Sequence, residues 1–163
     1  MIIKIKNKDT LIIENFELKC CVGKKGFKKN KVEGDNSTPK GIFGLGKLYW
    51  RYDRVKKPET RLECKKIKKN QGWCTDSRSK FYNKEFKIQK KYKHEKLNRK
   101  DSKYDLFIVI NYNRKKVLKN KGSAIFIHLT KEYKPTAGCI ALKKKDFLIL
   151  CKLLNKKSKI LII

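Results

Sequence analysis

The sequence predicts a mainly β fold with a minor helical part. Short apolar or alternating runs, which are typical of strands, recur from the first residues to the last. One stretch alone carries the spacing of an amphipathic helix, and strands and helices do not alternate in the βαβ pattern of a parallel sheet. A chain of 163 residues is long enough for one ordinary core, so we expect a single domain over 1–163.

Strands are expected wherever apolar residues cluster or alternate between turn residues. The segments are 2–6, 10–13, 16–23, 42–48, 104–112, 123–129 and 159–163. The first two flank Asn7-Lys8-Asp9 and predict a β-hairpin. Glycine, asparagine and proline in 34–41 predict a turn before the fourth segment. Segment 104–112 (YDLFIVINY) is the strongest candidate for a buried strand.

The predicted helix covers residues 143–154, where apolar residues recur at helical spacing. Asp146 near its start suits the helix dipole, and Cys151 is expected to be a small buried residue in its apolar face. Residues 51–103 are polar and irregular. A structureless stretch of this length is unusual unless it is functional, so we expect loops on the substrate side here.

The chain is strongly basic. Lysine and arginine number 45 against 15 acidic residues, which gives a formal net charge of +30 that attracts polyanions. Lysines spread along the whole chain, together with frequent asparagine and isoleucine, are also what composition drift in an A+T-rich genome produces. No helix-turn-helix, RNP or zinc-finger pattern is present, so we expect no specific nucleic-acid partner. A basic nucleic-acid-binding module remains a rival interpretation.

Several other classes are excluded or left open by the sequence. No apolar run approaches the ~18 residues of a transmembrane helix, and no secretory signal peptide is recognisable. The six cysteines include no CxxC pair, and only His94 and His128 offer imidazole, so we expect no metal site. Whether Cys64 and Cys74 form a disulfide is not decided by the sequence.

The chemistry is expected between two strands near the C-terminus. His128 lies in a predicted strand, and the following loop leads to Thr136-Ala137-Gly138-Cys139. A cysteine nucleophile needs an imidazole within hydrogen-bond reach, and a loop that turns back can bring Cys139 to His128. Gly138 lets the backbone approach a substrate, so the amides of Gly138 and Cys139 are candidates for stabilising an oxyanion.

These residues resemble the L,D-transpeptidase catalytic domain (YkuD) family, in which a strand histidine is followed by a loop and a Ser/Thr-x-Gly-Cys nucleophile motif. The resemblance covers nearly the whole chain and points to a compact subgroup without accessory domains. The other matching blocks are Val22-Gly23-Lys24, Gly34-Asp35, Thr38-Pro39-Lys40-Gly41-Ile42-Phe43, Gly72-Trp73-Cys74-Thr75-Asp76, Tyr82-Asn83, His94-Glu95, Tyr104-Asp105 and Ser123-Ala124-Ile125-Phe126-Ile127-His128. The implied fold is a β-sandwich or barrel of mixed sheets with one or two short helices.

The resemblance implies an L,D-transpeptidase that cross-links peptidoglycan stem peptides through a cysteine thioester, without metal or cofactor. It assigns Cys139 as nucleophile, His128 as base and later acid, Gly138 as an oxyanion donor, and the Leu129 carbonyl as the group that orients the imidazole. A thiolate–imidazolium pair would lower the pKa of the thiol. The donor residue and the type of cross-link stay open.

Candidate substrate-binding residues lie in the other matching blocks, at the end of segment 104–112 and in the nucleophile motif. They are Trp73, Asp76, Tyr82, Asn83, His94, Tyr112, Thr136 and Ala137. Packed aromatic side chains at Trp73 and Tyr82, a loop cap at Asp76 and a surface position for His94 are equally good interpretations. Asp35, Thr38 and Gly41 are expected to hold a turn beneath the site.

The sequence departs from the more familiar family motif Ser-His-Gly-Cys-x-Arg. Ala137 and Ala141 stand in place of the motif histidine and arginine, and Leu129 stands where a glycine usually follows the strand histidine. In the family the strand histidine is the base, so the resemblance still assigns that role to His128. The missing arginine leaves open how this protein recognises a substrate carboxylate.

Two alternatives remain within the resemblance. With water as acceptor, the same site would be an L,D-carboxypeptidase or another hydrolase of stem peptides, and an inactive wall-binding relative is the third possibility. The expected partners are peptidoglycan stem peptides, with electrostatic attachment to anionic wall polymer, and we expect a monomer. The resemblance implies the periplasm or cell wall, while the unrecognised signal peptide leaves cytoplasmic recycling of wall fragments as the alternative.

Overall fold

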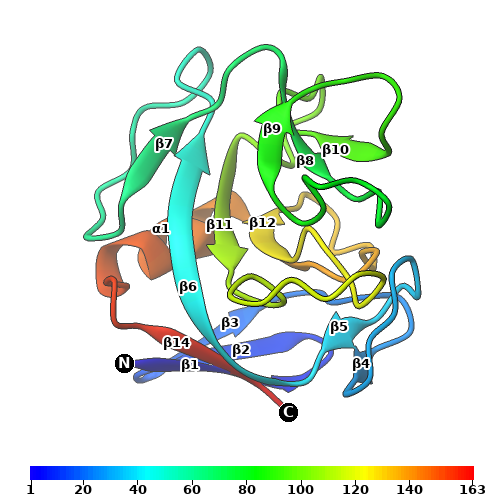
Figure 1. Cartoon of the computed structure of the whole chain (residues 1–163). Coiled ribbons are helices and arrows are strands. Elements are labelled where there is room, and N and C mark those ends of the chain that lie inside the picture. The colour runs from blue at the N-terminus through cyan, green and yellow to red at the C-terminus, as the bar shows by residue number, and fades with distance from the viewer.

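The computed structural model describes residues 1–163 and is mainly β with one helix, as predicted (Figure 1). The strands are β1 (Ile2–Asn7), β2 (Thr10–Ile13), β3 (Phe16–Lys19), β4 (Phe27–Lys28), β5 (Thr38–Pro39), β6 (Gly41–Trp50), β7 (Cys64–Lys66), β8 (Gln71–Cys74), β9 (Glu85–Lys87), β10 (His94–Lys96), β11 (Leu106–Ile110), β12 (Phe126–Leu129), β13 (Ile140–Leu142) and β14 (Lys159–Ile162). The helix is α1 (Lys144–Leu153).

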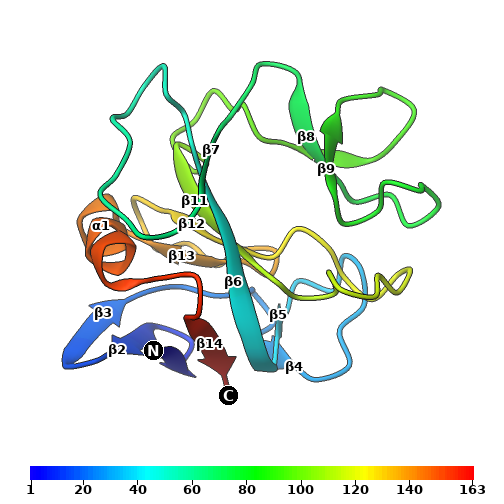
Figure 2. The same ribbon diagram turned by 60° about the vertical axis from the view of Figure 1, so that its left-hand side comes forward.

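A nine-stranded mixed sheet forms the frame. Its strand order is β13-β12-β11-β6-β14-β1-β2-β3, with β7 paired to β6. The two ends of this order meet, because Cys21, just after β3, forms an antiparallel bridge with Ala141 of β13. The sheet is therefore a nearly closed barrel, and Figure 2 shows β1, β2, β3 and β14 curving beneath β11, β12 and β13.

The N-terminal hairpin is confirmed. Strands β1 and β2 pair antiparallel, with Ile5 opposite Leu11. Alternate side chains of the pair, such as Ile3 and Ile13, point inward and are fully buried, as the period of two in a strand requires. Strand β14 then adds to β1 in parallel, which brings the C-terminal strand beside the N-terminal one.

Strand β11 is apolar on both faces because it separates two cores. Leu106, Ile108 and Ile110 point into the main core, which is shared by the barrel strands and α1. Phe107 and Val109 point the other way, into a second and smaller core. The continuous apolar run that predicted a buried strand thus reflects burial on both sides.

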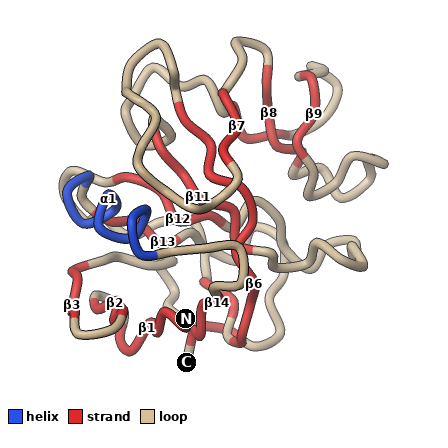
Figure 3. Tube along the Cα trace, turned by 90° about the vertical axis from the view of Figure 1, so that its left-hand side faces the viewer, coloured by secondary structure: helices blue, strands red, loops and turns tan.

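The helix agrees with its prediction. Phe147, Leu150 and Cys151 are buried on one face, and Asp146 lies in the first turn. Figure 3 shows α1 beside β12 and β13, with β1, β2 and β3 below it. This helix is too short and too polar to cross a membrane.

Residues 51–103 are more ordered than predicted. They contain β7 and the three strands of a separate antiparallel sheet of order β10-β8-β9. These strands have three or four residues each and carry many charged side chains, so they lack a visible alternation. Trp73 of β8 packs edge-on against Phe126 of β12, which attaches the small sheet to the second core.

All six cysteines are free thiols in the structure. Cys64 and Cys74, whose pairing the sequence left open, do not form a disulfide. Cys151 is fully buried in the main core, as predicted.

Candidate active site

The strand period places His128 and Cys139 on the same face of the sheet. Strands β12 and β13 pair in parallel, with His128 opposite Ala141. Because side chains alternate along a strand, Cys139 shares the face of Ala141, and His128 shares the face of Phe126. Their neighbours Ile127 and Ile140 point into the main core and fix this orientation.

A cavity of about 810 Å³ opens on this face. It is lined by His128, by Thr130 and by the whole motif from Thr136 to Cys139. Much of the rest of the wall is charged. Its basic residues are Lys31, Arg54, Arg99, Lys100, Lys103, Lys131 and Lys134, and its acidic residues are Glu33, Glu95, Asp101 and Glu132. The cavity therefore suits a ligand that carries charges of both signs.

The imidazole of His128 is held by the backbone of the next residue. Nδ1 lies 2.9 Å from the Leu129 carbonyl oxygen, the contact that the resemblance implied. A carbonyl only accepts, so Nδ1 carries the proton and Nε2 is left as an acceptor without a hydrogen-bond partner. The ring also packs edge-on against Tyr104, with ring centroids 5.4 Å apart. Burial lowers the pKa of His128 to about 4, so the ring is neutral at pH 7 and able to accept a proton.

The thiol of Cys139 is also neutral at rest. Its Sγ donates to the Ala124 carbonyl at 3.2 Å and accepts from the Phe126 amide at 3.3 Å, and it makes no hydrogen bond to His128. Burial raises the pKa of the Cys139 thiol to about 12. The prediction of a lowered thiol pKa is therefore wrong, because the side chain is desolvated and the neighbouring imidazole is neutral.

The backbone of the motif is fixed by hydroxyl groups. Thr136 Oγ1 donates to the Cys139 carbonyl at 2.6 Å and accepts from the Gly138 amide at 3.1 Å. Thr38, fully buried, donates to the Gly138 carbonyl at 2.8 Å and accepts from the Gly23 amide. The expected turn beneath the site is thus present at Thr38.

Only one of the two predicted oxyanion amides is free. The Gly138 amide is occupied by Thr136, whereas the Cys139 amide makes no hydrogen bond. Gly138 has φ +146°, and a Cβ there would lie 2.8 Å from the Ser37 carbonyl oxygen. Glycine is therefore required at this position for the chain to pass Ser37.

The cavity does not include most of the candidate substrate-binding residues. Thr136 and Ala137 line it, but Trp73, Asp76, Tyr82, Asn83, His94 and Tyr112 do not. Trp73 and Tyr82 are buried. The Asp76 carboxylate accepts hydrogen bonds from the backbone amides of Arg78 and Lys93 and so caps a loop. His94 lies half-buried in β10 with Nδ1 on the Tyr92 carbonyl, and Tyr112 donates to the Lys121 carbonyl. These side chains hold the walls and loops around the site.

Asn83 is the centre of this support. Its Oδ1 accepts from Trp73 Nε1 at 3.0 Å and from the Ala124 amide at 3.1 Å. Its Nδ2 donates to the carbonyls of Tyr112 and Asn113. Asn83 therefore fixes Ala124, whose carbonyl accepts a hydrogen bond from the Cys139 thiol.

Lys31 and Glu33 are among the residues of the cavity wall that sequence reasoning missed. Lys31 is 3% exposed, and Glu33 accepts hydrogen bonds from Tyr82 and from Ser123 Oγ. In a chain with 45 basic residues, nothing in the sequence sets Lys31 apart. The signal is its burial, which only the structure shows.

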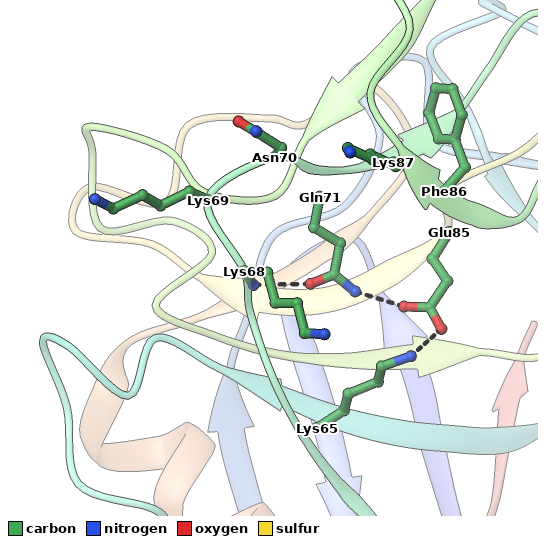
Figure 4. A pocket seen from close by; sticks show the side chains of 8 residues that line it. All are labelled: Lys65, Lys68, Lys69, Asn70, Gln71, Glu85, Phe86 and Lys87. Carbon is green, nitrogen blue, oxygen red and sulfur yellow. Dashed lines mark hydrogen bonds and ion pairs between the residues drawn. The ribbon is translucent and has the colours of Figure 1, made fainter.

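A second cavity of about 540 Å³ lies on the small sheet and is lined by Lys65, Lys68, Lys69, Asn70, Gln71, Glu85, Phe86 and Lys87 (Figure 4). Lys65 and Gln71 both contact the Glu85 carboxylate. This cavity contains no cysteine, histidine or free carboxylate. Nor does any group of three or more His, Cys, Asp or Glu side chains in the chain have an arrangement that could hold a metal ion.

Two bacterial proteins with solved structures have a similar fold. The helical cell shape determining protein Pgp2 from Campylobacter jejuni matches with a TM-score of 0.52 and 18% sequence identity, over 99% of this chain and 46% of that one. Bd1075 from Bdellovibrio bacteriovorus matches with a TM-score of 0.50 and 14% identity, over 99% of this chain and 47% of that one. The chain thus spans just under half the length of these proteins. A comparison with curated proteins gave no match.

The sequence itself also matches a protein family. The model of the L,D-transpeptidase catalytic domain, YkuD, matches residues 2–162, which is nearly the whole chain and includes every residue of the cavity described above. The chain therefore belongs to the L,D-transpeptidase catalytic domain (YkuD) family.

Proposed function

We propose that this protein is a cysteine-dependent L,D-transpeptidase that cross-links peptidoglycan stem peptides. One observation carries the proposal. His128, tethered through Nδ1 to the Leu129 carbonyl and with Nε2 free, lines the same cavity as Cys139. A nucleophile, a base and a group that orients the base are the parts that acyl transfer requires.

The reaction begins from a neutral pair. When a donor stem enters the cavity, the Cys139 thiol gives its proton to His128 Nε2 as Sγ attacks a peptide carbonyl. The tetrahedral intermediate collapses, the C–N bond breaks, and the imidazolium gives its proton to the leaving amine. A thioester on Cys139 remains. The amine of an acceptor stem then loses a proton to His128 and attacks the thioester, and the thiolate that leaves recovers that proton.

Coupling proton transfer to attack fits the burial of both groups. A full thiolate–imidazolium pair would be costly in this desolvated setting, because burial penalises both charged forms. Substrate must draw Sγ away from the Ala124 carbonyl before the proton can move to His128. The Cys139 amide is the available donor for the developing oxyanion.

The charged wall of the cavity suits stem peptides, which carry amines and carboxylates together. The net charge of +30 would also hold the protein on anionic wall polymer. We expect this attachment to weaken as salt is raised. Action on the wall places the protein in the periplasm or cell wall, and we propose one catalytic domain acting as a monomer.

The test is incubation of the purified protein with tripeptide, tetrapeptide and pentapeptide muropeptides, with products identified by mass. Three proteins are compared: the wild type, Cys139→Ala, and Cys64→Ser, which removes a half-buried thiol outside the cavity. A cross-linked dimer from the wild type and Cys64→Ser, but not from Cys139→Ala, supports the proposal.

Two other results would overturn it. A shortened monomer in place of a dimer would identify an L,D-carboxypeptidase. Equal inactivity of all three folded proteins would identify an inactive wall-binding relative.

A further inference from the structure

Lys31 differs from the other basic residues of the cavity in its burial. The side chain is 3% exposed, and Lys31 is the one buried cation in the wall of the active-site cavity. Lysine is almost never fully buried without a reason, because removing an ammonium from water is costly. Its placement therefore needs an explanation in terms of what the ammonium contacts.

Two glycines make room for this side chain. A Cβ on Gly122, which has φ +98°, would lie 2.9 Å from Lys31 Cε and 3.1 Å from Cδ. A Cβ on Gly138 would lie 3.5 Å from Lys31 Nζ. The stem of Lys31 thus passes Gly122, and its ammonium ends beside Gly138, the residue that precedes the nucleophile.

Asp35 holds the ammonium in place without using all its donors. Lys31 Nζ donates to Asp35 Oδ1 at 2.6 Å and makes no other hydrogen bond. The Asp35 carboxylate is shared, since it also accepts from the amides of Val32 and Ser37. An ammonium has three donors, so two N–H groups of Lys31 remain for a ligand.

A negatively charged oxygen is the ligand that this group suits best. The other basic residues of the wall are exposed or only partly buried, and Ala141, on the same wall, carries no charge. A peptide carbonyl is neutral until it is attacked. A carboxylate carries its full charge as soon as the substrate binds, and so it matches a fixed ammonium better.

We propose that Lys31, positioned by Asp35, binds a carboxylate of the donor stem peptide next to the carbonyl that Cys139 attacks. This inference rests on the proposed function and identifies the group that selects the donor. It assigns to Lys31 the recognition of a substrate carboxylate, which Ala141 is unable to provide.

The experiment compares two donor muropeptides that differ only in whether the carboxylate near the scissile bond is free or amidated. Formation of the Cys139 thioester is followed by mass. The wild type should prefer the free acid by about 10- to 100-fold in kcat/KM, the range expected for a hydrogen bond to a charged group. Lys31→Met keeps the length of the side-chain stem. This variant should lose the preference because its kcat/KM falls on the free-acid donor and not on the amidated one.

Lys28→Met is the matched control. Lys28 also approaches Asp35, at 3.6 Å, but it is half-exposed and does not line the cavity. This variant should keep the wild-type preference. The acid-to-amide ratio is the decisive readout, because a general loss of stability lowers both rates and leaves their ratio unchanged.

Three outcomes would overturn the inference, and they differ in the rates measured on the two donors. Equal wild-type rates on acid and amide would show that no carboxylate is recognised, while the thioester would still support the proposed function. An equal fall on both donors in a folded Lys31→Met, which leaves the acid-to-amide ratio at its wild-type value, would show that Lys31 does not recognise the carboxylate. If Lys31→Met does not fold, Lys31→Gln replaces it, and an unchanged ratio in that variant would reject the role of Lys31.

Discussion

The Ala124 carbonyl accepts a hydrogen bond from the Cys139 thiol, with 3.2 Å between oxygen and sulfur. Ala124 has φ +53°, a left-handed conformation that is unusual for alanine and that turns its carbonyl toward the nucleophile. Asn83 Oδ1 holds this conformation by accepting a hydrogen bond from the Ala124 amide. The nucleophile is therefore kept protonated at rest by a strained residue that lies far from it in sequence.

A protonated, buried thiol predicts slow alkylation at neutral pH. With a pKa raised to about 12, Cys139 should react with iodoacetamide at a rate that rises about tenfold per pH unit between pH 7 and pH 10. Mass spectrometry of peptides locates the label. Cys64, which is more exposed, should be labelled before Cys139. A Cys139 rate that is already constant above pH 7 would instead reveal a resting ion pair.

The buried imidazole predicts that stability rises with pH across the acid range. Burial lowers the pKa of His128 from 6.5 to about 4, so between these values the unfolded chain binds a proton that the folded protein does not. The free energy of unfolding should therefore fall by about 3 kcal/mol as pH drops from 6.5 to 4 through this group alone. Urea unfolding at several pH values measures it. His128→Gln should remove this part of the slope, and an unchanged slope would show that His128 is protonated in the folded state.

Removal of the Asn83 side chain should cost stability and slow the chemistry. Asn83→Ala leaves the Trp73 indole N–H and the Ala124 amide without their acceptor, and we expect a loss of about 3 kcal/mol. Thermal unfolding and the rate of thioester formation check this. Asn36→Ala is the control, because Asn36 also has positive φ but its side chain makes a single long hydrogen bond. Similar losses in both variants would show that backbone conformation alone is responsible.

Asp35 should stabilise the protein at neutral pH and not at low pH. Hydrogen bonds from Lys31, Val32 and Ser37 hold the pKa of Asp35 below its ordinary value of 3.8, despite its burial. A lowered pKa in the folded state gives stability that is present above pH 4 and is lost as pH falls below it. Asp35→Asn leaves the Lys31 charge buried and should cost about 3 kcal/mol at pH 7. The cost should shrink toward pH 2.

Glu59, which pairs with Lys152 at 3.2 Å where both side chains are exposed, provides the comparison. Glu59→Gln should change stability far less than Asp35→Asn. Equal effects of the two substitutions, or an Asp35→Asn cost independent of pH, would contradict the role given to the buried pair.

Gly138 should not tolerate a side chain. Gly138→Ala places a Cβ 2.8 Å from the Ser37 carbonyl oxygen at a φ of +146°, and we expect a loss of about 2 kcal/mol or more together with loss of thioester formation. Chemical unfolding and muropeptide assays measure the two effects. Gly34→Ala separates strain from crowding, since Gly34 has φ +74° but nothing within 4 Å of its Cβ position. If Gly138→Ala and Gly34→Ala lose stability and activity to the same extent, the contact between Gly138 and Ser37 does not require glycine.

Long apolar patterns predicted the frame of this protein correctly. The N-terminal hairpin, the strand over Leu106–Ile110 and the helix over Lys144–Leu153 all follow from periodicity that burial imposes on a sequence. The small sheet in 51–103 was missed, because its strands are short and are stabilised by pairing and by the packing of Trp73. Such contacts leave no periodic signal.

The same division holds at the site. His128 and Cys139 were identifiable because a strand, a loop and a glycine before a cysteine are local features, and the parallel pairing of β12 and β13 places them on one face. The aromatic and polar candidates Trp73, Tyr82 and Asn83 were placed in the substrate cleft, whereas they form its support. Sequence blocks mark residues that matter without showing which way their side chains point.

The sequence by itself determined the mainly β class, the nucleophile motif and the strand histidine, because each is encoded by neighbouring residues. Tertiary structure alone decided the protonation of Cys139 and His128. It alone also set Lys31 apart, by burial beside the nucleophile, from the other residues among the 45 lysines and arginines. Protonation depends on burial and on the Ala124 and Leu129 carbonyls, and the placement of Lys31 depends on Gly122, Gly138 and Asp35. Desolvation and close packing arise between distant segments, and they exist only once the chain has folded.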